Sequence, residues 1–310
     1  MDGSEYRASI EIYGRIMRYA EAKRGGGAPP QLVRLGACDF DFDVAETVLG
    51  LAGTTHLQTV GTALQEIFDG SEAAKLVVTV HPWNCTSFFS PLPEGMAPAA
   101  RFEQLRQEAA MLSDASVARP VRVKATPVRI ERLPNGRRAH WHHVLRLSDS
   151  VHARLDHIAK RPTPGVEPGD WAHEFTDTMA AAAAVVARRP EMEESEALAL
   201  AVGLYGDRAE YVLCRGTSWQ FGHYAETGAL EDRPYFVAAL LDRLGATPSE
   251  VEHLYLYGDH VEAGSMQGVE HLLDRSVQAL NPLDIFGPTR SGADPFILAS
   301  YAPVIGALLR

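Results

Sequence analysis

The chain has 310 residues, of which 46% are hydrophobic and 22% charged, which is the balance of a folded protein with a substantial core. This length predicts two lobes or one large α/β unit. A formal net charge of −11 argues against a general nucleic-acid-binding protein, because such a protein needs a basic excess to neutralise phosphates.

The three cysteines, Cys38, Cys85 and Cys214, lie far apart and form no CxxC pair. This pattern favours a reducing compartment such as the cytoplasm, with Cys38 and Cys214 as small buried side chains. No run of about 18 apolar residues occurs, and the N-terminus lacks a signal-peptide pattern. We therefore expect no membrane insertion, and expect another chain to hold the protein at any membrane where it works.

The N-terminal part predicts three strands joined by glycine turns, at residues 8–13, 16–22 and 31–42. A helix follows at residues 56–68, and a short apolar strand at residues 75–80 is typical of a strand buried between helices. His81 and Cys85 follow that strand. A catalytic pair is one interpretation, but a separation of four residues along a strand is about 13 Å, so loop packing is favoured.

The middle of the chain predicts a smaller α+β unit. Residues 100–113 form an amphipathic helix, with Phe102, Leu105, Ala109 and Leu112 expected on its inner face. The alternating strand 121–132 is joined by Asn135-Gly136, a strong hairpin signal, to a strand at residues 140–147.

Histidines gather on the second of these strands. His140 and His142 share a strand face, and with a third ligand they would suit zinc; His143 lies next to them, and His152 and His157 follow. No Cys or carboxylate has a matching spacing, so a solvated sheet edge is the favoured interpretation. A helix at 150–160, a proline-rich loop at 161–169 and a buried alanine-rich helix at 176–188 complete this part.

A second group of three strands is predicted at residues 197–204, 209–214 and 218–224. It repeats the pattern of the first 42 residues and suggests an internal duplication. Further along come a helix at 234–244, a helical turn at 247–250, a strand at 253–258 and a helix at 266–280. A loop or short strand at 281–286 and an apolar helix at 296–309, interrupted at Pro303, end the chain.

The order of these elements resembles the actin-like ATPase superfamily, and within it the PilM-like type IV pilus assembly proteins and the related GspL cytoplasmic domain. The matching stretches are Leu254-Tyr-Leu-Tyr-Gly-Asp, Asn281-Pro282-Leu283 and the closing segment PFILASYAPVIGALLR. The resemblance implies duplicated, ribonuclease H-like α/β lobes: a first lobe over residues 1–195, with an inserted subdomain at about 96–160, and a second over 196–310. Only about 25 residues separate Gly228 from the strand at 253, too few for the subdomain that closes over ATP in this superfamily.

The resemblance also implies where phosphate loops would lie, at the first turn of each lobe. The first equivalent reads Glu11-Ile12-Tyr13-Gly14-Arg15, in which the carboxylate is longer than the family's Asp and a Tyr is inserted. The second reads Gly203-Leu204-Tyr205-Gly206-Asp207-Arg208, which lacks the family's leading Asp and its Thr. Gly258 and Asp259 lie where the family contacts adenosine or ribose. Both loops lack the Asp that would orient Mg²⁺ and the attacking water, so nothing positions these groups for ATP hydrolysis.

These departures predict a non-catalytic, actin-like scaffold of a type IV pilus or type II secretion-like assembly. It would be a degenerate ATPase that needs no cofactor, with ATP and Mg²⁺ as the weaker possibility. Its expected partners are proteins of a membrane-associated assembly, chiefly the cytoplasmic tail of a membrane protein. Trp83 and Trp219 are candidate anchors, although core packing is the favoured interpretation for each. The expected location is the cytoplasm, peripheral to the inner membrane through a partner.

The alternative is an active actin-like ATPase or a sugar-kinase-like phosphotransferase with atypical loops, in which Asp207 or Asp259 binds Mg²⁺. An α/β hydrolase is excluded because the sequence has no G-x-S-x-G motif.

Overall fold

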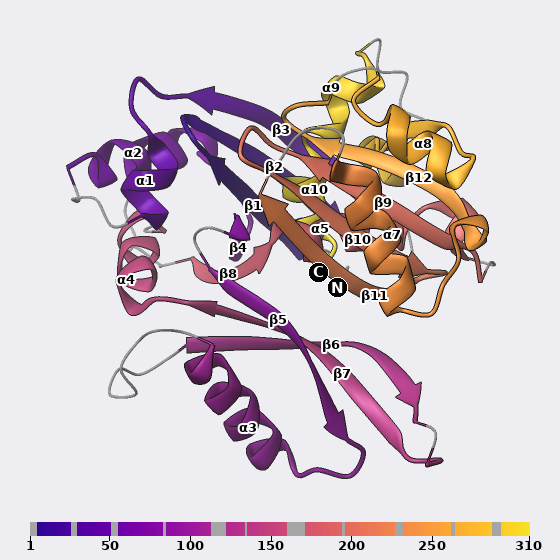
Figure 1. Ribbon diagram of the computed structural model, residues 1–310. Coiled ribbons are helices and arrows are strands. Elements are labelled where there is room, and N and C mark those ends of the chain that lie inside the picture. Colours follow the sequence, from indigo (N-terminus) through magenta and orange to yellow (C-terminus); the bar gives the residue numbers. More distant parts are fainter. Residues whose placement is uncertain are drawn as a thin grey trace. The chain divides into compact units, whose positions relative to one another are not determined.

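The structure is a computed structural model, and it describes residues 5–25, 30–50, 55–82, 85–112, 122–133, 135–159, 171–193, 196–226, 232–261, 264–286 and 293–310. The chain divides into two compact units, Met1–Asp177 and Thr178–Arg310 (Figure 1). This division comes earlier in the chain than residue 195, so the alanine-rich helix that was expected in the first lobe belongs to the second unit.

The first unit consists, in chain order, of β1 (Glu5–Tyr13), β2 (Ile16–Arg24), β3 (Gln31–Asp39), α1 (Val44–Leu49), α2 (Leu57–Ile67), β4 (Lys75–Val80), β5 (Thr86–Pro93), α3 (Pro98–Met111), β6 (Arg122–Arg132), β7 (Arg138–Leu147), α4 (Asp149–Ile158) and β8 (Ala172–Asp177).

The second unit consists of α5 (Thr178–Val186), α6 (Pro190–Glu193), β9 (Leu198–Leu204), β10 (Arg208–Arg215), β11 (Ser218–Glu226), α7 (Arg233–Arg243), the 3-10 helix η3 (Pro248–Glu250), β12 (Val251–Gly258), α8 (Gln267–Leu273), β13 (Val277–Ala279), the 3-10 helix η4 (Pro282–Phe286), α9 (Pro295–Ala299) and α10 (Ala302–Leu308).

The two units repeat one sheet topology. The first sheet has the strand order β3-β2-β1-β4-β8, and the second has the order β11-β10-β9-β12-β13. In each sheet an antiparallel meander is followed by two strands that run parallel to its first strand. The duplication that the sequence pattern suggested is therefore confirmed at the level of topology.

Alternation along the strands decides which side chains enter the core of the first unit. Ile10 and Ile12 of β1 are fully buried and pack with Leu64 of α2 and Leu155 of α4. The residue between them, Glu11, points to the opposite face, because successive side chains of a strand alternate. A strand with an apolar face thus also carries a buried carboxylate on its other face.

The second unit buries its sheet between helices on both faces. Leu200 and Val202 of β9 pack with Val237 of α7 and Val269 of α8 on one face. Helix α5 contacts β9, β10 and β11, and it also packs against α10. Consequently every residue of β9 is buried, as expected for a central strand with helices on both sides.

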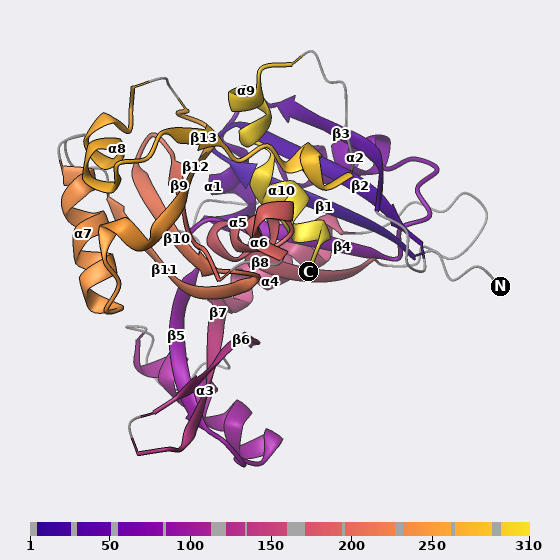
Figure 2. The ribbon, with the colours of Figure 1, turned by 90° about the vertical axis from the view of Figure 1, so that its right-hand side faces the viewer.

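A third sheet, of order β5-β7-β6, forms with α3 a smaller layer that we call the small subdomain, residues 86–147 (Figures 1 and 2). It begins earlier than the expected insertion at about residue 96, because β5 is one of its strands. Helix α4, which we placed inside the insertion, instead packs on α1 and α2 of the first sheet's layer.

Several local expectations were wrong. Residues 172–177 form the strand β8, although its last two residues were assigned to a helix; its polar Thr176 and Asp177 gave no strand pattern. Helix α8 ends at Leu273, because Asp274 adopts a left-handed conformation with φ 53°, and β13 follows where helix was expected. On α3, Leu105 and Ala109 are buried as predicted, but Phe102 is 50% exposed and Leu112 59% exposed.

Helices α1 and α6 were not predicted, whereas the break in the closing helix near Pro303 is confirmed as the junction between α9 and α10. The proline-rich loop 161–169 and Trp83 lie outside the described residues. Trp219 is buried, with 6% of its surface exposed, which leaves little of it available as an anchor. No helix among the described residues is long and apolar enough to cross a membrane.

Gly306 provides a test of the helix packing in the second unit. A Cβ atom at Gly306 would collide with the backbone carbonyl oxygen of Ala181 in α5. We expect Gly306→Ala to destabilise the second unit by about 1–3 kcal/mol, the usual cost of overpacking.

Gly61 of α2 is the matched control, because its nearest neighbour would lie 3.8 Å from an added Cβ. There Gly→Ala should stabilise the protein by about 0.5–1 kcal/mol through the better helix propensity of alanine. Scanning calorimetry measures both changes. An unchanged melting temperature in Gly306→Ala would contradict the tight contact between α5 and α10.

Candidate functional site

Six of the eight residues predicted to form the site lie on two hairpins, one in each unit, and the other two, Gly258 and Asp259, lie at the end of β12. Glu11, Gly14 and Arg15 belong to the hairpin β1–β2, and Gly203, Gly206 and Asp207 to the hairpin β9–β10. Each hairpin places its first strand in the sheet next to a parallel strand, β4 or β12.

The turn of the first hairpin is tied to the segment that follows β3. Gly14, with φ 55°, has a carbonyl oxygen that accepts a hydrogen bond from the N–H of Ala45 at the start of α1 (3.0 Å). The Arg15 Nε donates to the carbonyl oxygen of Phe40 (2.7 Å) and lies 3.7 Å from Oδ1 of Asp39. The guanidinium of Arg15, a residue of the first predicted phosphate loop, thus contacts the end of β3.

Glu11 lies fully buried beneath this turn. Its carboxylate is 3.3 Å from Nε2 of His81 and 3.6 Å from Nη1 of Arg18, and both partners are buried. The sheet register creates the cluster, because Glu11 is opposite Arg18 on β2 and opposite Thr79 on β4, two residues before His81. A buried carboxylate needs such compensation, since an isolated charge there would be very costly.

Gly203 lies inside β9 and gives room to a tyrosine. A Cβ at this position would meet the ring of Tyr257 at 2.5 Å, and Tyr257 is fully buried on the neighbouring strand β12. The absence of a side chain at Gly203 therefore makes space for an aromatic ring, rather than exposing a backbone N–H to phosphate.

Glu210 of β10 is the centre of a second buried cluster. Its Oε1 accepts hydrogen bonds from Nε of Arg208 (3.0 Å) and Oγ1 of Thr178 (2.7 Å), and its Oε2 accepts one from the hydroxyl of Tyr257 (2.9 Å). Glu210 and Arg208 both have 0% exposure. Three donors on one carboxylate, with a buried cation among them, make this arrangement strongly interdependent.

The turn between β9 and β10 is closed around Arg208. The N–H of Tyr205 donates to the carbonyl oxygen of Arg208 (3.0 Å), and the Arg208 guanidinium lies 4.4 Å from the centre of the Tyr205 ring. Nη1 of Arg208 also donates to Oδ1 of Asp207 (3.0 Å), whose side chain is 44% exposed. The turn that was predicted as a phosphate loop is thus built around a buried arginine–tyrosine contact.

Gly258 and Asp259 come next to this turn in the second unit. Gly258 ends β12 with φ 102°, and a Cβ there would collide with the carbonyl oxygen of Leu204. The N–H of His260 donates to that same oxygen (3.1 Å). Glycine is required because the chain leaves the strand in a conformation that L-residues rarely adopt while lying against another backbone. The structure therefore brings five residues together at the end of the second sheet where the parallel strands β9 and β12 finish: Gly203, Gly206, Asp207, Gly258 and Asp259.

The histidine cluster is not a solvated sheet edge. β7 is the central strand of the small sheet, and His142 and His143 are buried. His143 Nε2 lies 3.0 Å from Oδ2 of the buried Asp177, and burial lowers the pKa of His142. The described part of the chain contains no group of three His, Cys, Asp or Glu placed to hold a metal ion. The edge prediction failed because the strand β5 was not recognised.

Cys214 is buried, as predicted, whereas Cys38 is only partly buried. The thiol of Cys85 donates to the backbone carbonyl of His81 (3.4 Å), while the His81 imidazole faces Glu11. Burial raises the pKa of the Cys214 thiol to about 12, which makes its reactive thiolate form scarce at neutral pH.

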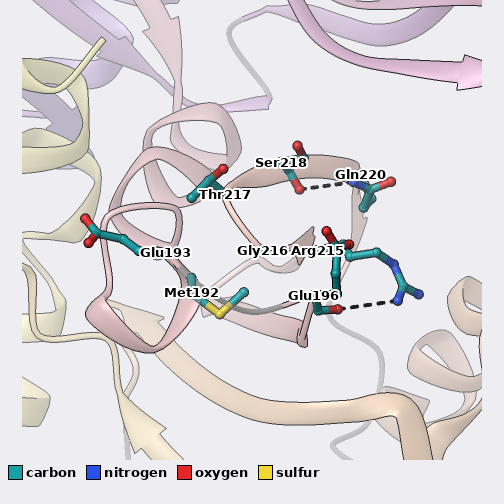
Figure 3. Close-up of a pocket in the computed structure, with 8 residues that line it drawn as sticks. All are labelled: Met192, Glu193, Glu196, Arg215, Gly216, Thr217, Ser218 and Gln220. Carbon is teal, nitrogen blue, oxygen red and sulfur yellow. Dashed lines mark hydrogen bonds between the residues drawn. The ribbon is translucent and has the colours of Figure 1, made fainter.

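A polar hollow of about 350 Å³ lies at the other end of β10, beside the turn to β11 (Figure 3). Arg215 lies 3.7 Å from the carboxylate of Glu250, and its guanidinium donates to the carbonyl oxygen of Glu196 (3.5 Å). Gln220 donates to the carbonyl oxygen of Ser218 (3.2 Å). Because β10 separates Arg215 from Arg208, this hollow is distinct from the predicted phosphate turn.

Sequence reasoning assigned His81 and Arg208 to other roles, and it missed the remaining partners of the two buried carboxylates as well as the second carboxylate itself: Arg18, Thr178, Tyr257 and Glu210. A usable signal existed in β10, where Arg208 and Glu210 alternate with the apolar Ala209 and Tyr211. An ion pair at positions i and i+2 within an otherwise apolar strand indicates two charges on the same buried face.

The repeated topology and the two hairpins define the class of protein: the chain has the actin-like ATPase fold. A protein with actin-like ATPase fold and unknown function from Bacteroides thetaiotaomicron has a TM-score of 0.51 and 11% identity, with 90% of this chain and 91% of that chain covered. A chain of the PilM-PilN type IV pilus biogenesis complex is similar with a TM-score of 0.70 and 14% identity, over 97% of both chains. The fold implied by the sequence resemblance is confirmed.

A third similar structure is the cytoplasmic domain of EpsL, an inner membrane component of the type II secretion system of Vibrio cholerae. It has a TM-score of 0.42 and 12% identity, over 89% of this chain and 98% of that one. No protein-family model and no curated protein matches the chain.

The Glu210 cluster leads to a stability prediction. Glu210→Gln keeps the side-chain shape but removes the buried carboxylate that pairs with Arg208, leaving only the exposed carboxylate of Asp207 on that guanidinium. Breaking a buried pair costs about 3–5 kcal/mol. We expect a loss of that size in the free energy of unfolding of the second unit, measured by denaturant titration.

Asp207→Asn is the matched control, since Asp207 contacts the same guanidinium from an exposed position. An exposed ion pair contributes less than about 1 kcal/mol. Equal losses in the two variants would contradict the central place of Glu210.

Proposed function

We propose that the protein is a non-catalytic, actin-like scaffold of a type IV pilus or type II secretion-like assembly, and that it binds the cytoplasmic tail of a membrane protein. The observation that carries the proposal is the occupation of both hairpins by the protein's own side chains. Its assembly context is supported by the likeness in fold to a chain of the PilM-PilN complex.

The chemistry of the two hairpins favours a structural role. Catalysis of phosphoryl transfer requires carboxylate oxygens that hold Mg²⁺ and backbone N–H groups that face phosphate. Both oxygens of Glu210 accept hydrogen bonds from buried donors, and the Glu11 carboxylate faces His81 and Arg18. Recruiting either carboxylate to a metal would leave a buried cation uncompensated, which is costly.

Partner binding fits the sheet topology. β3 and β11 are the edge strands of the first and second sheets, so each has an outer side that pairs with no other described strand of its sheet. Extended peptides bind such edges through backbone hydrogen bonds. A short tail of a membrane protein, added as a strand or laid in a groove, would keep the protein in the cytoplasm yet peripheral to the inner membrane.

One observation supports the alternative function, an ATPase or phosphotransferase. Asp207 and Asp259 both lie where the parallel strands β9 and β12 end, and the side chain of Asp207 is 44% exposed. A metal bound there would compete with Arg208 for Asp207.

A thermal-shift assay with Mg-ATP separates the two functions. A ligand at about a hundred times its dissociation constant stabilises the folded state by about 2.7 kcal/mol, several degrees for a domain of this size. We expect no shift at millimolar Mg-ATP. A Mg²⁺-dependent shift that disappears in Asp207→Asn or Asp259→Asn would establish the alternative.

Binding of the partner is tested with labelled peptides that correspond to the cytoplasmic tails of the pilus or secretion membrane proteins encoded in the same genome. We expect one tail to bind with a fluorescence anisotropy change that is independent of Mg-ATP, and a scrambled peptide of the same composition not to bind. If every tail binds no better than its scrambled form, the scaffold proposal fails.

A further inference from the structure

The small subdomain differs in charge from the rest of the protein. Residues 86–147 contain ten Lys or Arg and five Asp or Glu, a net charge of +5. The remaining residues contain 19 Lys or Arg and 35 Asp or Glu, a net charge of −16. Such a separation of charge within one chain indicates that the basic part contacts an anionic partner.

The same subdomain exposes large apolar side chains. Of the seven large hydrophobic residues that are well exposed among the described residues, four belong to it: Phe102, Met111, Leu112 and Ile130. Ile130, on β6, is 60% exposed. Basic and apolar side chains therefore occur together in the part of the molecule that carries the positive charge.

The far end of the hairpin β6–β7 arranges these groups on one face. Arg132 is paired with Arg138 in the sheet register, and Ile130 is paired with His140, so Ile130, Arg132 and Arg138 share a face of the strands. Arg137 follows in the connecting turn, where Leu133 donates to its carbonyl oxygen (2.8 Å). All four side chains of this hairpin tip (Ile130, Arg132, Arg137 and Arg138) are exposed.

The opposite face of the same strands carries a fixed aromatic side chain. The Arg129 guanidinium lies 4.7 Å from the Trp141 ring, and the Trp141 indole N–H donates to Glu131 (2.6 Å). This packing stiffens the end of the hairpin. Within the described residues, the ion pair recorded at the hairpin tip joins Arg138 to the exposed Glu94 at 3.5 Å.

We propose that the hairpin tip of the small subdomain docks directly on the surface of an anionic phospholipid bilayer. Arg132, Arg137 and Arg138 would interact with lipid phosphates, and Ile130 would enter the boundary between headgroups and acyl chains. The remainder of the chain, with its large negative charge, is repelled by the same surface, so the tip is the part that approaches it. This contact is additional to the proposed binding of a membrane protein's tail and does not depend on it.

The combination of side chains favours a bilayer over another polyanion. A polyanion without apolar groups, such as polyglutamate, is bound through positive charge alone. An exposed isoleucine beside the arginines gains free energy only where apolar surface is buried. A bilayer interface offers both, with anionic headgroups above an apolar layer.

Vesicle co-sedimentation of the whole protein tests the proposal. We expect binding to vesicles of phosphatidylcholine with about one third phosphatidylglycerol, no binding to pure phosphatidylcholine, and weakening by salt. The triple variant Arg132→Gln, Arg137→Gln, Arg138→Gln should bind roughly a hundredfold more weakly, since each surface cation contributes about fivefold.

Arg188→Gln, Arg215→Gln, Arg243→Gln is the matched control, because it removes the same charge elsewhere and should bind within about threefold of the unchanged protein. For the apolar contribution, Ile130→Ser is compared with Ile297→Ser, whose isoleucine is 64% exposed on α9. We expect only Ile130→Ser to weaken binding, by roughly three- to tenfold, without altering the salt dependence. Circular dichroism melting checks that all variants are folded.

Three results would overturn the proposal. The first is no binding to anionic vesicles at low salt. The second is an equal loss in the two triple variants, which would indicate only net charge. The third is binding of an RNA oligonucleotide or polyglutamate without binding to vesicles, which would assign the hairpin tip to another class of partner.

Discussion

The hydrogen-bonded carboxylate of Glu210 is the interaction on which the second unit depends. It joins three elements, because its donors come from β10, from the start of α5 and from β12. Arg208, which it neutralises, in turn holds the turn between β9 and β10 against the Tyr205 ring. Removing this carboxylate would take away the only buried anion among the described partners of Arg208, so the contacts among β10, α5 and β12 and the turn depend on one group.

The first unit also contains a buried carboxylate whose charge is compensated, but different residues provide the compensation. Glu11 lies near the end of β1, the first strand of its hairpin, and faces Arg18 and His81, whereas Glu210 lies on β10, the second strand of its hairpin. The topology is repeated, but the charged groups are not at equivalent positions. The shared fold thus rests on buried strands and helices, and each hairpin is stabilised by its own polar cluster.

Much of the fold was predictable because hydrophobic periodicity and turn-forming residues can be recognised within short segments of the sequence. The meanders, the buried strand β4, the hairpin at Asn135-Gly136 and the break before Pro303 follow from alternation, glycine and proline. β8 was missed because it is short and rich in polar residues whose burial depends on neighbouring elements, and β13 because it has only three residues. The exposure of Phe102 was missed for a related reason, since helix periodicity does not reveal how wide a face the small sheet can cover.

The sequence by itself determined the duplicated strand pattern, the positions of the hairpin turns and the separation of charge between the small subdomain and the remainder of the chain. Only the tertiary structure decided what fills the hairpins. The partners of Glu11 and Glu210 come from strands and a helix up to 70 residues away, such as His81 for Glu11. Strand register and packing across elements bring these residues together, and neither is encoded in the spacing of residues along one segment.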